Sequence, residues 1–331
     1  MPTPNHFYLR DRFEKLHTHD LSEKSIESLS ETRSVNTLDA YESDWNDFCD
    51  WCRFHRKNAF PASSDTVVNY INDLADNAKI STIRRRISAI SENFNAAGLE
   101  ENNPCRAWIV KEALTGLSRR LGTAQKGKTP VYWEDLEKIM ALMKPDVLGD
   151  IRDKAILLTG FMGAFRRSEL AGLNVENLAR FPQGLVITVT QSKTDQKKTG
   201  QQIGIPYIKN SSMCAVRALD QWMKAGSIQA GPLFRSLLKN GKVSDRRLSD
   251  KSMNLILKKR VAQIGLDPNL YGAHSLRHGF ATYAALHGVE ERLIMKQTRH
   301  RSVEMVRHYI NEADLFVNNP VSMIFDPRKQ S

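Results

Sequence analysis

The stretch HSLRHGFATYAALHGVEERLIMKQTRHRSVEMVRHY, residues 274–309, determines how the rest of the chain is interpreted. Its apolar residues recur at helical spacing, which predicts a run of short helices. His274 and Arg277 then lie one helical turn apart, and His300 and Tyr309 follow downstream. Breaking a phosphodiester requires cations on the non-bridging oxygens, a nucleophile in line and proton donors for the leaving oxygen. This stretch supplies one group of each kind.

Two cations further upstream extend the set. Arg166 lies in the segment FRRSEL, and Lys193 lies in a lysine-rich turn between two predicted strands. The order Arg, Lys, His-x-x-Arg, His, Tyr resembles the tyrosine recombinases, the phage integrase family, and is closest to the two-domain Cre- and Xer-like members. His-x-x-Arg alone is common in helices, whereas the complete ordered set on a basic chain of this length is specific. The resemblance covers the chain from about Ser34 to about Tyr309.

The residue types fit the chemistry of this family. Arg166 and Arg277 can each hold a phosphate oxygen bidentately and stabilise pentavalent phosphorus without a metal. Nearby cations favour the phenolate of Tyr309, which makes it a nucleophile at neutral pH. His274 is expected to take the tyrosine proton or to bridge the phosphate, and His300 to hydrogen-bond a non-bridging oxygen. No metal, nucleotide or other cofactor is expected.

The resemblance implies further roles. Lys193 corresponds to the mobile lysine that protonates the leaving 5′-oxygen, with Lys197 and Lys198 as alternatives in the same loop. Glu169, three residues after Arg166, is expected to orient an active-site cation. The covalent intermediate is expected to be a 3′-phosphotyrosine with a free 5′-hydroxyl.

Two positions depart from the family pattern. The family usually has glycine before the second histidine, whereas this chain has Arg299. That arginine either contacts phosphate or faces solvent, and the sequence does not distinguish the two. Arg167 sits beside Arg166, and the pattern Arg-x-Ser-Glu-Leu selects Arg166.

Composition limits the class of protein and its partner. The 331 residues are enough for about two domains, and a net charge of +11 favours a polyanionic partner. The longest apolar stretch, residues 155–165, is too short for a membrane span and predicts a buried helix. Four cysteines without a secretory signal predict reduced thiols and a cytoplasmic protein. The family resemblance implies a bacterial, phage-borne or plasmid-borne protein associated with the nucleoid. Cys49, Cys52 and His55 have zinc-like spacing, but they lie on a predicted helix without a fourth ligand.

The predicted fold is mainly α-helical and is organised as a C-shaped clamp on DNA. Residues 1–30 are expected to be a mobile arm, 31–122 a helical core DNA-binding domain, and 123–130 a linker. Residues 131–318 are expected to form a mostly helical catalytic domain with a small β-sheet. Its later helices are predicted at about 250–264, 275–286 and 290–297. Residues 319–331 are predicted to be an exchange segment carrying the apolar run Val321–Phe325.

Basic clusters mark candidate DNA contacts, and a solvated surface is the alternative interpretation for each. They lie on a predicted helix at 80–97, in the linker, and on and before a predicted helix at 252–264. The candidates are Arg84, Arg85, Arg86, Lys126, Lys128, Arg246, Arg247, Lys258, Lys259 and Arg260.

The sequence therefore predicts a site-specific DNA recombinase. The family resemblance implies that its partner is double-stranded DNA with an inverted-repeat site, bound by a homotetramer that exchanges C-terminal segments and forms a Holliday junction. The alternative for the segment is docking on its own domain. The alternative functions are a type IB-like topoisomerase and a catalytically inactive DNA-binding or architectural protein.

Overall fold

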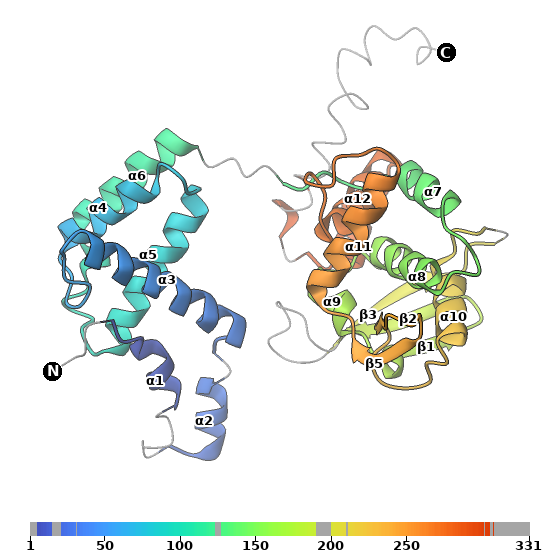
Figure 1. Cartoon of the computed structure of the whole chain (residues 1–331), viewed down its shortest axis with the longest axis horizontal. Coiled ribbons are helices and arrows are strands. Elements are labelled where there is room, and N and C mark those ends of the chain that lie inside the picture. The colour runs from blue at the N-terminus through green and yellow to red at the C-terminus, as the bar shows by residue number, and fades with distance from the viewer. Residues whose placement is uncertain are drawn as a thin grey trace, which may run out of the picture. The chain divides into compact units, whose positions relative to one another are not determined.

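The computed structural model describes residues 5–14, 21–30, 32–122, 127–189, 200–209, 211–300, 302–304 and 307. The chain divides into two compact units, Met1–Lys126 and Gly127–Ser331 (Figure 1). The described part of the first unit is helical, and the second combines helices with two small sheets. The mainly helical fold predicted from the sequence is confirmed.

The described part of the first unit is built from six α-helices and one short 3-10 helix. They are α1 (Tyr8–Glu14), α2 (Glu23–Ser30), α3 (Val35–Phe54), α4 (Ser64–Leu74), α5 (Ile80–Ala96), the 3-10 helix Pro104–Arg106 and α6 (Trp108–Leu121). The hydroxyls of Ser34 and Ser63 accept hydrogen bonds from the first turns of α3 and α4, which fixes where these helices begin. Aromatic side chains dominate the core. They are Trp45, Phe48, Phe60, Tyr70 and Phe94.

The beginning of the chain differs from the predicted mobile arm. Residues 8–14 form α1, and Phe7 and Leu9 are buried in the core of the first unit. The buried amide of Asn93 accepts from the Leu9 backbone N–H at 3.1 Å and donates to the His6 carbonyl at 3.0 Å. Two buried apolar residues and the buried amide therefore help to dock this polar segment on the first unit. The prediction is corrected for residues 5–14.

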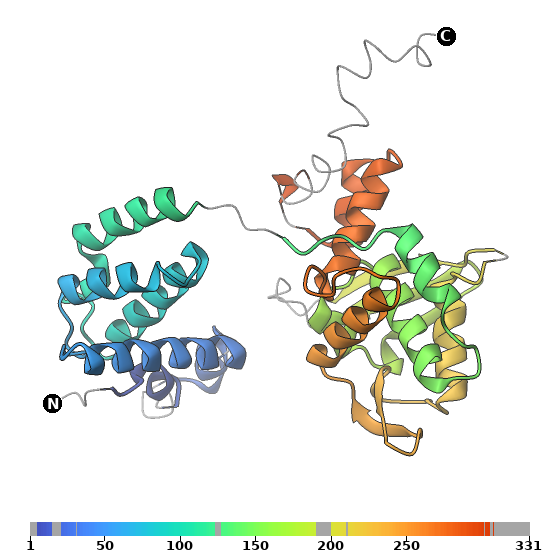
Figure 2. The same ribbon diagram turned by 45° about the horizontal axis from the view of Figure 1, so that its top comes forward.

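The second unit is organised around a buried helix. Its elements are α7 (Trp133–Ala141), α8 (Leu148–Met162), α9 (Arg167–Gly172), the 3-10 helix Val175–Asn177, β1 (Leu178–Phe181), β2 (Gly184–Val189), β3 (Gln201–Pro206), α10 (Ala215–Ala225), β4 (Arg235–Leu237), β5 (Val243–Arg247), α11 (Asp250–Gln263), α12 (His274–Leu286) and α13 (Glu291–Thr298). Residues 155–161 of α8 are all buried, as expected from the long apolar stretch. α8 packs against α10 and α12, and α12 also packs against α13 (Figure 2).

Two antiparallel sheets complete the second unit. The larger has the order β1-β2-β3, and its register places Leu185 opposite Ile205 and Ile187 opposite Ile203. All four side chains are buried in the core, since alternate residues of a strand point to the same face. β4 and β5 form a separate two-stranded sheet just before α11.

The end of the predicted linker is attached to the second unit. The Lys128 ammonium donates to the Asn269 carbonyl at 2.6 Å, and the Thr129 N–H donates to the Leu270 carbonyl at 3.0 Å. The Val131 N–H then donates to the Ser275 carbonyl at 3.1 Å. Residues 128–131 therefore run beside the loop that leads into α12.

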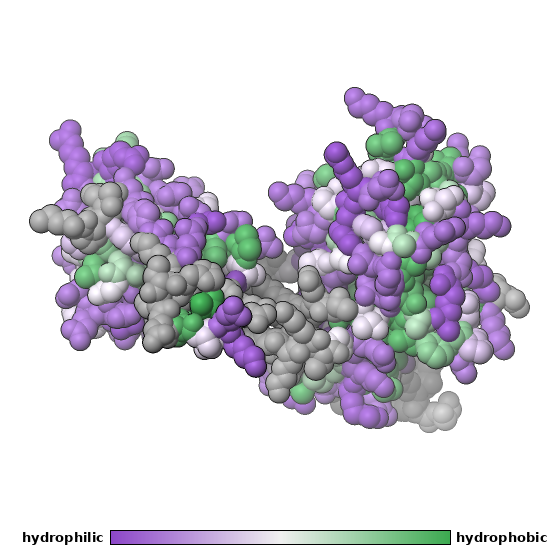
Figure 3. Space-filling view, turned by 90° about the horizontal axis from the view of Figure 1, so that it is seen from below, coloured by the Kyte–Doolittle hydropathy of each residue, from purple (hydrophilic) through white to green (hydrophobic). Residues whose placement is uncertain are grey.

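On the face drawn in Figure 3, hydrophilic residues predominate and hydrophobic residues form smaller patches. No helix within the described ranges has both the length and the apolar composition needed to cross a bilayer.

Candidate active site

The first turn of α12 carries His274 and Arg277, as the sequence predicts. Arg277 is fully buried, with 0% of its surface exposed, and its NH1 donates to the Ala164 carbonyl at 2.8 Å. Ala164 lies just beyond α8 in a left-handed conformation, with φ 44°. His274 is an exposed residue, but partial desolvation of its ring, followed by repulsion from Arg277, lowers its pKa. The ring is therefore neutral at neutral pH.

Arg166 and Glu169 form a paired unit at the start of α9. One carboxylate oxygen of Glu169 accepts the Arg166 backbone N–H at 2.9 Å, and the other accepts its NH1 at 2.6 Å. Burial would raise the pKa of Glu169, but attraction to Arg299 and hydrogen bonds from Arg166 outweigh it and lower that pKa. Glu169 is therefore ionised and is hydrogen-bonded to Arg166.

The segment after α13 brings His300 to the same region. The Thr298 hydroxyl donates to the Ile294 carbonyl at 2.7 Å and lies 2.8 Å from His300 Nδ1. Because that hydroxyl proton is already used, Nδ1–H donates to Thr298. Burial, followed by repulsion from Arg277, lowers the pKa of His300 to about 3. His300 is thus neutral at neutral pH.

These groups form one cluster. Arg277 and Arg166 each act on the pKa of both histidines, and Arg166 NH2 lies 3.5 Å from the Arg299 carbonyl. Two guanidiniums and two imidazoles can surround a phosphate with donors, which is the arrangement that phosphoryl transfer without a metal requires. Within the described residues, no group of three or more His, Cys, Asp or Glu is placed to hold a metal ion.

Two predicted catalytic residues, Lys193 and Tyr309, lie outside the described residues. The alternatives Lys197 and Lys198 lie outside them too. Their roles stay predictions from the sequence.

Two residues beside the cluster, Arg299 and His278, had no structural role predicted from the sequence. Arg299 neither faces solvent nor lies on an exposed phosphate-binding surface: its side chain is 3% exposed and pairs with Glu169 at 2.8 Å. His278, one turn after His274, is buried, and its Nδ1 lies 2.9 Å from the Lys128 carbonyl, so it joins α12 to the end of the linker. The signal for Arg299 was its replacement of a glycine; His278 gave no signal beyond its place in the motif.

Arg260 was predicted to contact DNA, and the structure corrects this prediction. The residue is only 3% exposed, with its Nε 2.9 Å from Asp153 and its NH2 2.5 Å from Asp150. Arg152 also bonds Asp153, at 2.8 Å. Arg260 therefore joins α11 to α8 rather than facing a phosphate.

Several other predicted contacts are committed to protein partners. Arg86 donates hydrogen bonds to Asp47 and to the Tyr70 hydroxyl, so it holds α5 to α3 and α4. The prediction that Arg86 contacts DNA phosphate is therefore corrected. Arg85 is paired with Asp44. Arg247 donates to the carbonyls at the end of α9, and the Lys128 ammonium is bonded as described above.

The remaining predicted DNA contacts are more accessible to a phosphate. Arg84, Arg246 and Lys259 are exposed and Lys258 is half-buried, while Lys126 lies outside the described residues. Arg84 makes one surface hydrogen bond, to the Ser118 hydroxyl at 3.0 Å. These cations can reach a phosphate without breaking a buried contact.

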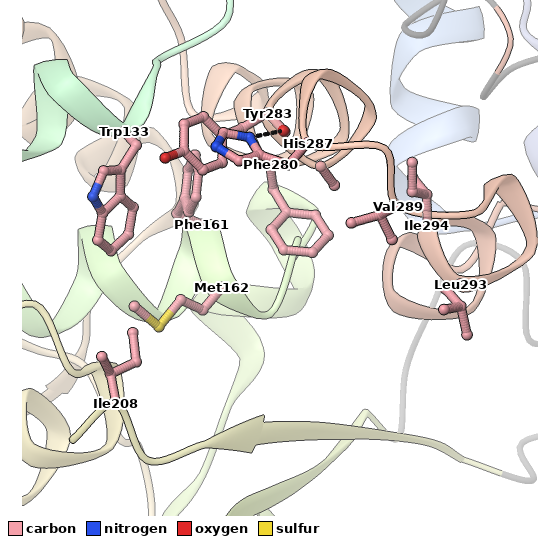
Figure 4. Close-up of a pocket in the computed structure, with 11 residues that line it drawn as sticks. Trp133, Phe161, Met162, Ile208, Phe280, Tyr283, His287, Val289, Leu293 and Ile294 are labelled. Atoms are coloured by element: carbon pink, nitrogen blue, oxygen red, sulfur yellow. Dashed lines mark hydrogen bonds between the residues drawn. The ribbon is translucent and has the colours of Figure 1, made fainter. Parts of the chain in front are cut away.

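An apolar pocket of about 360 Å³ opens between α7, α8, α12 and α13 (Figure 4). Figure 4 shows Phe280 and Tyr283 of α12, and His287 just after that helix, over one side of the pocket. The His287 ring is hydrogen-bonded to the Tyr283 carbonyl at 2.8 Å. Leu293 contributes to the lining and is 45% exposed. The described part of the chain leaves this apolar surface open.

The comparisons with known proteins agree with this arrangement. Residues 131–315 match the phage integrase family, and residues 26–101 match the phage integrase N-terminal SAM-like domain. The fold and the site thus define a DNA-breaking and -rejoining enzyme. The chain belongs to the phage integrase family of tyrosine recombinases.

Individual relatives and solved structures show that the chain is similar to Xer recombinases. The chain is 45% identical over 307 residues to an integrase/recombinase xerD homolog of Selenomonas ruminantium, covering 92% of this chain and 90% of the relative. It is 25% identical over 282 residues to tyrosine recombinase XerC of Thermodesulfovibrio yellowstonii, covering 83% and 85%. The fold resembles the XerH recombinase bound to palindromic difH, with a TM-score of 0.67 at 14% identity over 96% of this chain and 88% of that one. The predicted site-specific recombinase is supported, and the topoisomerase and inactive-protein alternatives are not favoured.

Proposed function

We propose that this chain cleaves and rejoins DNA at a specific site by using Tyr309 as the nucleophile. The observation that carries the proposal is the cluster of Arg166, Arg277, His274 and His300, in which hydrogen bonds fix Arg166, Arg277 and His300, and both arginines act on the pKa of His274. Buried, fixed donors stabilise developing charge without reorganising during the reaction. The family's sequence order places Tyr309 nine residues after His300.

The reaction transfers a phosphoryl group twice. The Tyr309 oxygen attacks the scissile phosphorus while His274 takes its proton, and the bond from phosphorus to the 5′-oxygen breaks. Lys193 gives a proton to that oxygen. Arg166 and Arg277 hold the non-bridging oxygens, with His300 donating once the bound anion has raised its pKa. A 5′-hydroxyl then attacks the phosphotyrosine and restores the phosphodiester, so the number of high-energy bonds is unchanged and no ATP is required.

The proposed substrate is duplex DNA with inverted-repeat half-sites. Solved relatives in complex with DNA, such as XerH on difH, motivate this proposal. The exposed cations Arg84, Arg246 and Lys259 would contact its phosphates. The two units would close around the duplex as a clamp, and the protein would act in the cytoplasm on chromosomal, phage or plasmid DNA.

The proposed active assembly is a tetramer joined by exchanged C-terminal segments. The apolar pocket between α7, α8, α12 and α13 offers a receptor, and the run Val321–Phe325 offers an apolar ligand at the end of the chain. Exchange of one strand pair within the tetramer would form a Holliday junction. Leu293→Asp, at an exposed pocket position, would then block assembly of the four-protomer complex but leave binding of one protomer to a half-site intact. Intact synapsis in this variant, measured by gel shift, would favour docking of the segment elsewhere.

A covalent-trap assay tests the proposal. Nicked duplexes drawn from DNA flanking the gene, or from a sequenced insertion junction, are incubated with the full chain in EDTA. The expected result is a protein–DNA adduct that survives SDS in the wild type and is absent in Tyr309→Phe. An adduct formed equally by both proteins would refute Tyr309 as the nucleophile.

A further inference from the structure

Arg299 occupies a backbone position that suits glycine. It follows α13 with φ 58° and ψ 41°, in the left-handed region that costs an L-residue free energy and glycine almost none. A non-glycine residue persists in such a conformation when its surroundings hold it there. The side chain therefore has contacts that compensate for the backbone.

The Arg299 guanidinium is enclosed by acceptors. NH1 donates to the Gly163 carbonyl at 3.0 Å and to the Gln297 carbonyl at 2.7 Å. NH2 donates to the Ala164 carbonyl at 2.9 Å and to Glu169 at 2.8 Å. Its carbon lies 5.2 Å from the centre of the Phe165 ring, within cation–π range. These contacts fix the side chain as a rigid cation beneath the site.

Two of its partners are shared with the proposed catalytic arginines. The Ala164 carbonyl accepts from Arg299 and also from Arg277, at 2.8 Å. Glu169 accepts from Arg299 and also from Arg166, at 2.6 Å. The buried Arg299 side chain thus shares one acceptor with Arg277 and another with Arg166. Arg299 also directly precedes His300 in the chain.

Arg299 also changes the net charge beside Arg166. Glu169 positions Arg166, but a lone carboxylate would also cancel the charge of that arginine. With Arg299 present, the group formed by Arg166, Glu169 and Arg299 carries a net charge of +1, and without Arg299 it would be neutral. A positive charge a few ångströms from a bound anion strengthens its binding, because the attraction is weakly screened inside a protein.

We propose that Arg299 is a positioning residue of this active site: it neutralises Glu169 and fixes the Ala164 carbonyl, so that Arg166 and Arg277 meet the scissile phosphate with undiminished charge. This rests on the proposed function, in which those two arginines hold the phosphate. Burial would raise the pKa of Glu169, whereas Arg299 is the strongest influence that lowers it, which agrees with the pairing.

Sulfate binding to the full-length, DNA-free protein tests the proposal. Sulfate resembles phosphate, and the Nε–H signals of ¹⁵N-arginine report its binding; Arg166→Lys and Arg277→Lys assign those signals. Arg299→Gln is expected to weaken sulfate binding on the order of tenfold at constant ionic strength, because one nearby positive charge is lost. Arg299→Lys, which keeps the charge, is expected to retain affinity within about threefold of the wild type.

A double variant separates positioning from folding. Glu169→Gln combined with Arg299→Gln removes both charges, restores the net charge, and is expected to recover most of the lost affinity. Arg260→Gln is the matched control, since it removes another buried, ion-paired arginine of the same unit and is expected to lower stability without changing sulfate affinity. Thermal melting of each variant identifies any that fail to fold, and the Arg299→Lys comparison remains if Arg299→Gln is among them.

Three results would overturn the proposal. They are no sulfate-dependent shift of Arg166 and Arg277 in the wild type, equal affinity in Arg299→Gln, and a double variant no better than the single one. If Arg299→Gln does not fold, loss of binding in a folded Arg299→Lys would overturn it instead. Because no DNA is used, failure of the covalent-trap assay would count against the proposed function and leave this measurement independent.

Discussion

Replacing Arg277 by lysine is expected to separate catalysis from folding. The guanidinium donates through NH1 to the Ala164 carbonyl, and a phosphate would need its remaining donors. Lysine keeps the positive charge but carries it on a single nitrogen. It therefore cannot hydrogen-bond the Ala164 carbonyl and the phosphate together in the geometry of a planar guanidinium. Loss of one fixed donor to a developing oxyanion costs about 3–4 kcal/mol, or 10²–10³ in rate. We therefore expect single-turnover cleavage to slow by roughly that factor.

The same variant should remain folded. Ala164 keeps a second donor, because Arg299 NH2 lies 2.9 Å from its carbonyl. The expected loss of unfolding free energy is then about 1 kcal/mol, as for one hydrogen bond. The assay compares adduct formation under single-turnover conditions with binding to the same duplex and with urea denaturation. Cleavage within about threefold of the wild type in a folded Arg277→Lys protein would refute the reasoning.

Three further outcomes follow from the described residues. Between about pH 6.5 and 3, His300 binds a proton in the unfolded chain but not in the folded chain, because folding lowers its pKa. The free energy of unfolding therefore falls as pH falls through that range. His300→Asn should therefore lose less stability than the wild type between pH 7 and 4 in parallel thermal melts, and identical pH profiles would contradict the burial argument. Arg260→Ala should cost about 3 kcal/mol of unfolding free energy, since it removes the arginine that pairs with Asp150 and leaves the buried Asp153 with Arg152 alone. Weakened DNA binding without that loss in denaturant titrations would restore Arg260 as a DNA contact. Lys259→Gln, at an exposed position of α11, should reduce the log–log salt slope of DNA binding by about 1 and leave stability unchanged; an unaltered slope would show that Lys259 faces solvent in the complex.

Periodicity predicted the elements that carry the site. The apolar spacing around His274 gave helix limits of 275–286, against 274–286 observed for α12, and the helix at 290–297 is observed at 291–298. The two strands predicted on either side of the lysine-rich turn are observed as β2 and β3, which pair with each other. In each case a local pattern decides which face is buried, so the sequence alone is informative.

Long-range pairing could not be predicted in this way. Lys258, Lys259 and Arg260 are adjacent and chemically similar, yet Arg260 alone of the three meets Asp150 and Asp153, more than 100 residues away on α8. The docking of Leu9 depends on Asn93, which is 84 residues distant. The conformation of Arg299 depends on acceptors in three separate segments. Charge patterns show where cations occur, whereas the folded chain determines which of them are already paired.

The most direct test of the central claim is to identify the residue joined to DNA. The adduct formed on a nicked duplex would be digested with nuclease and protease, and the remaining nucleotide located by tandem mass spectrometry. The account predicts a 3′-linked nucleotide on Tyr309, with the peptide from Tyr309→Phe unmodified. A nucleotide on any other residue, or an intact adduct in Tyr309→Phe, would contradict it.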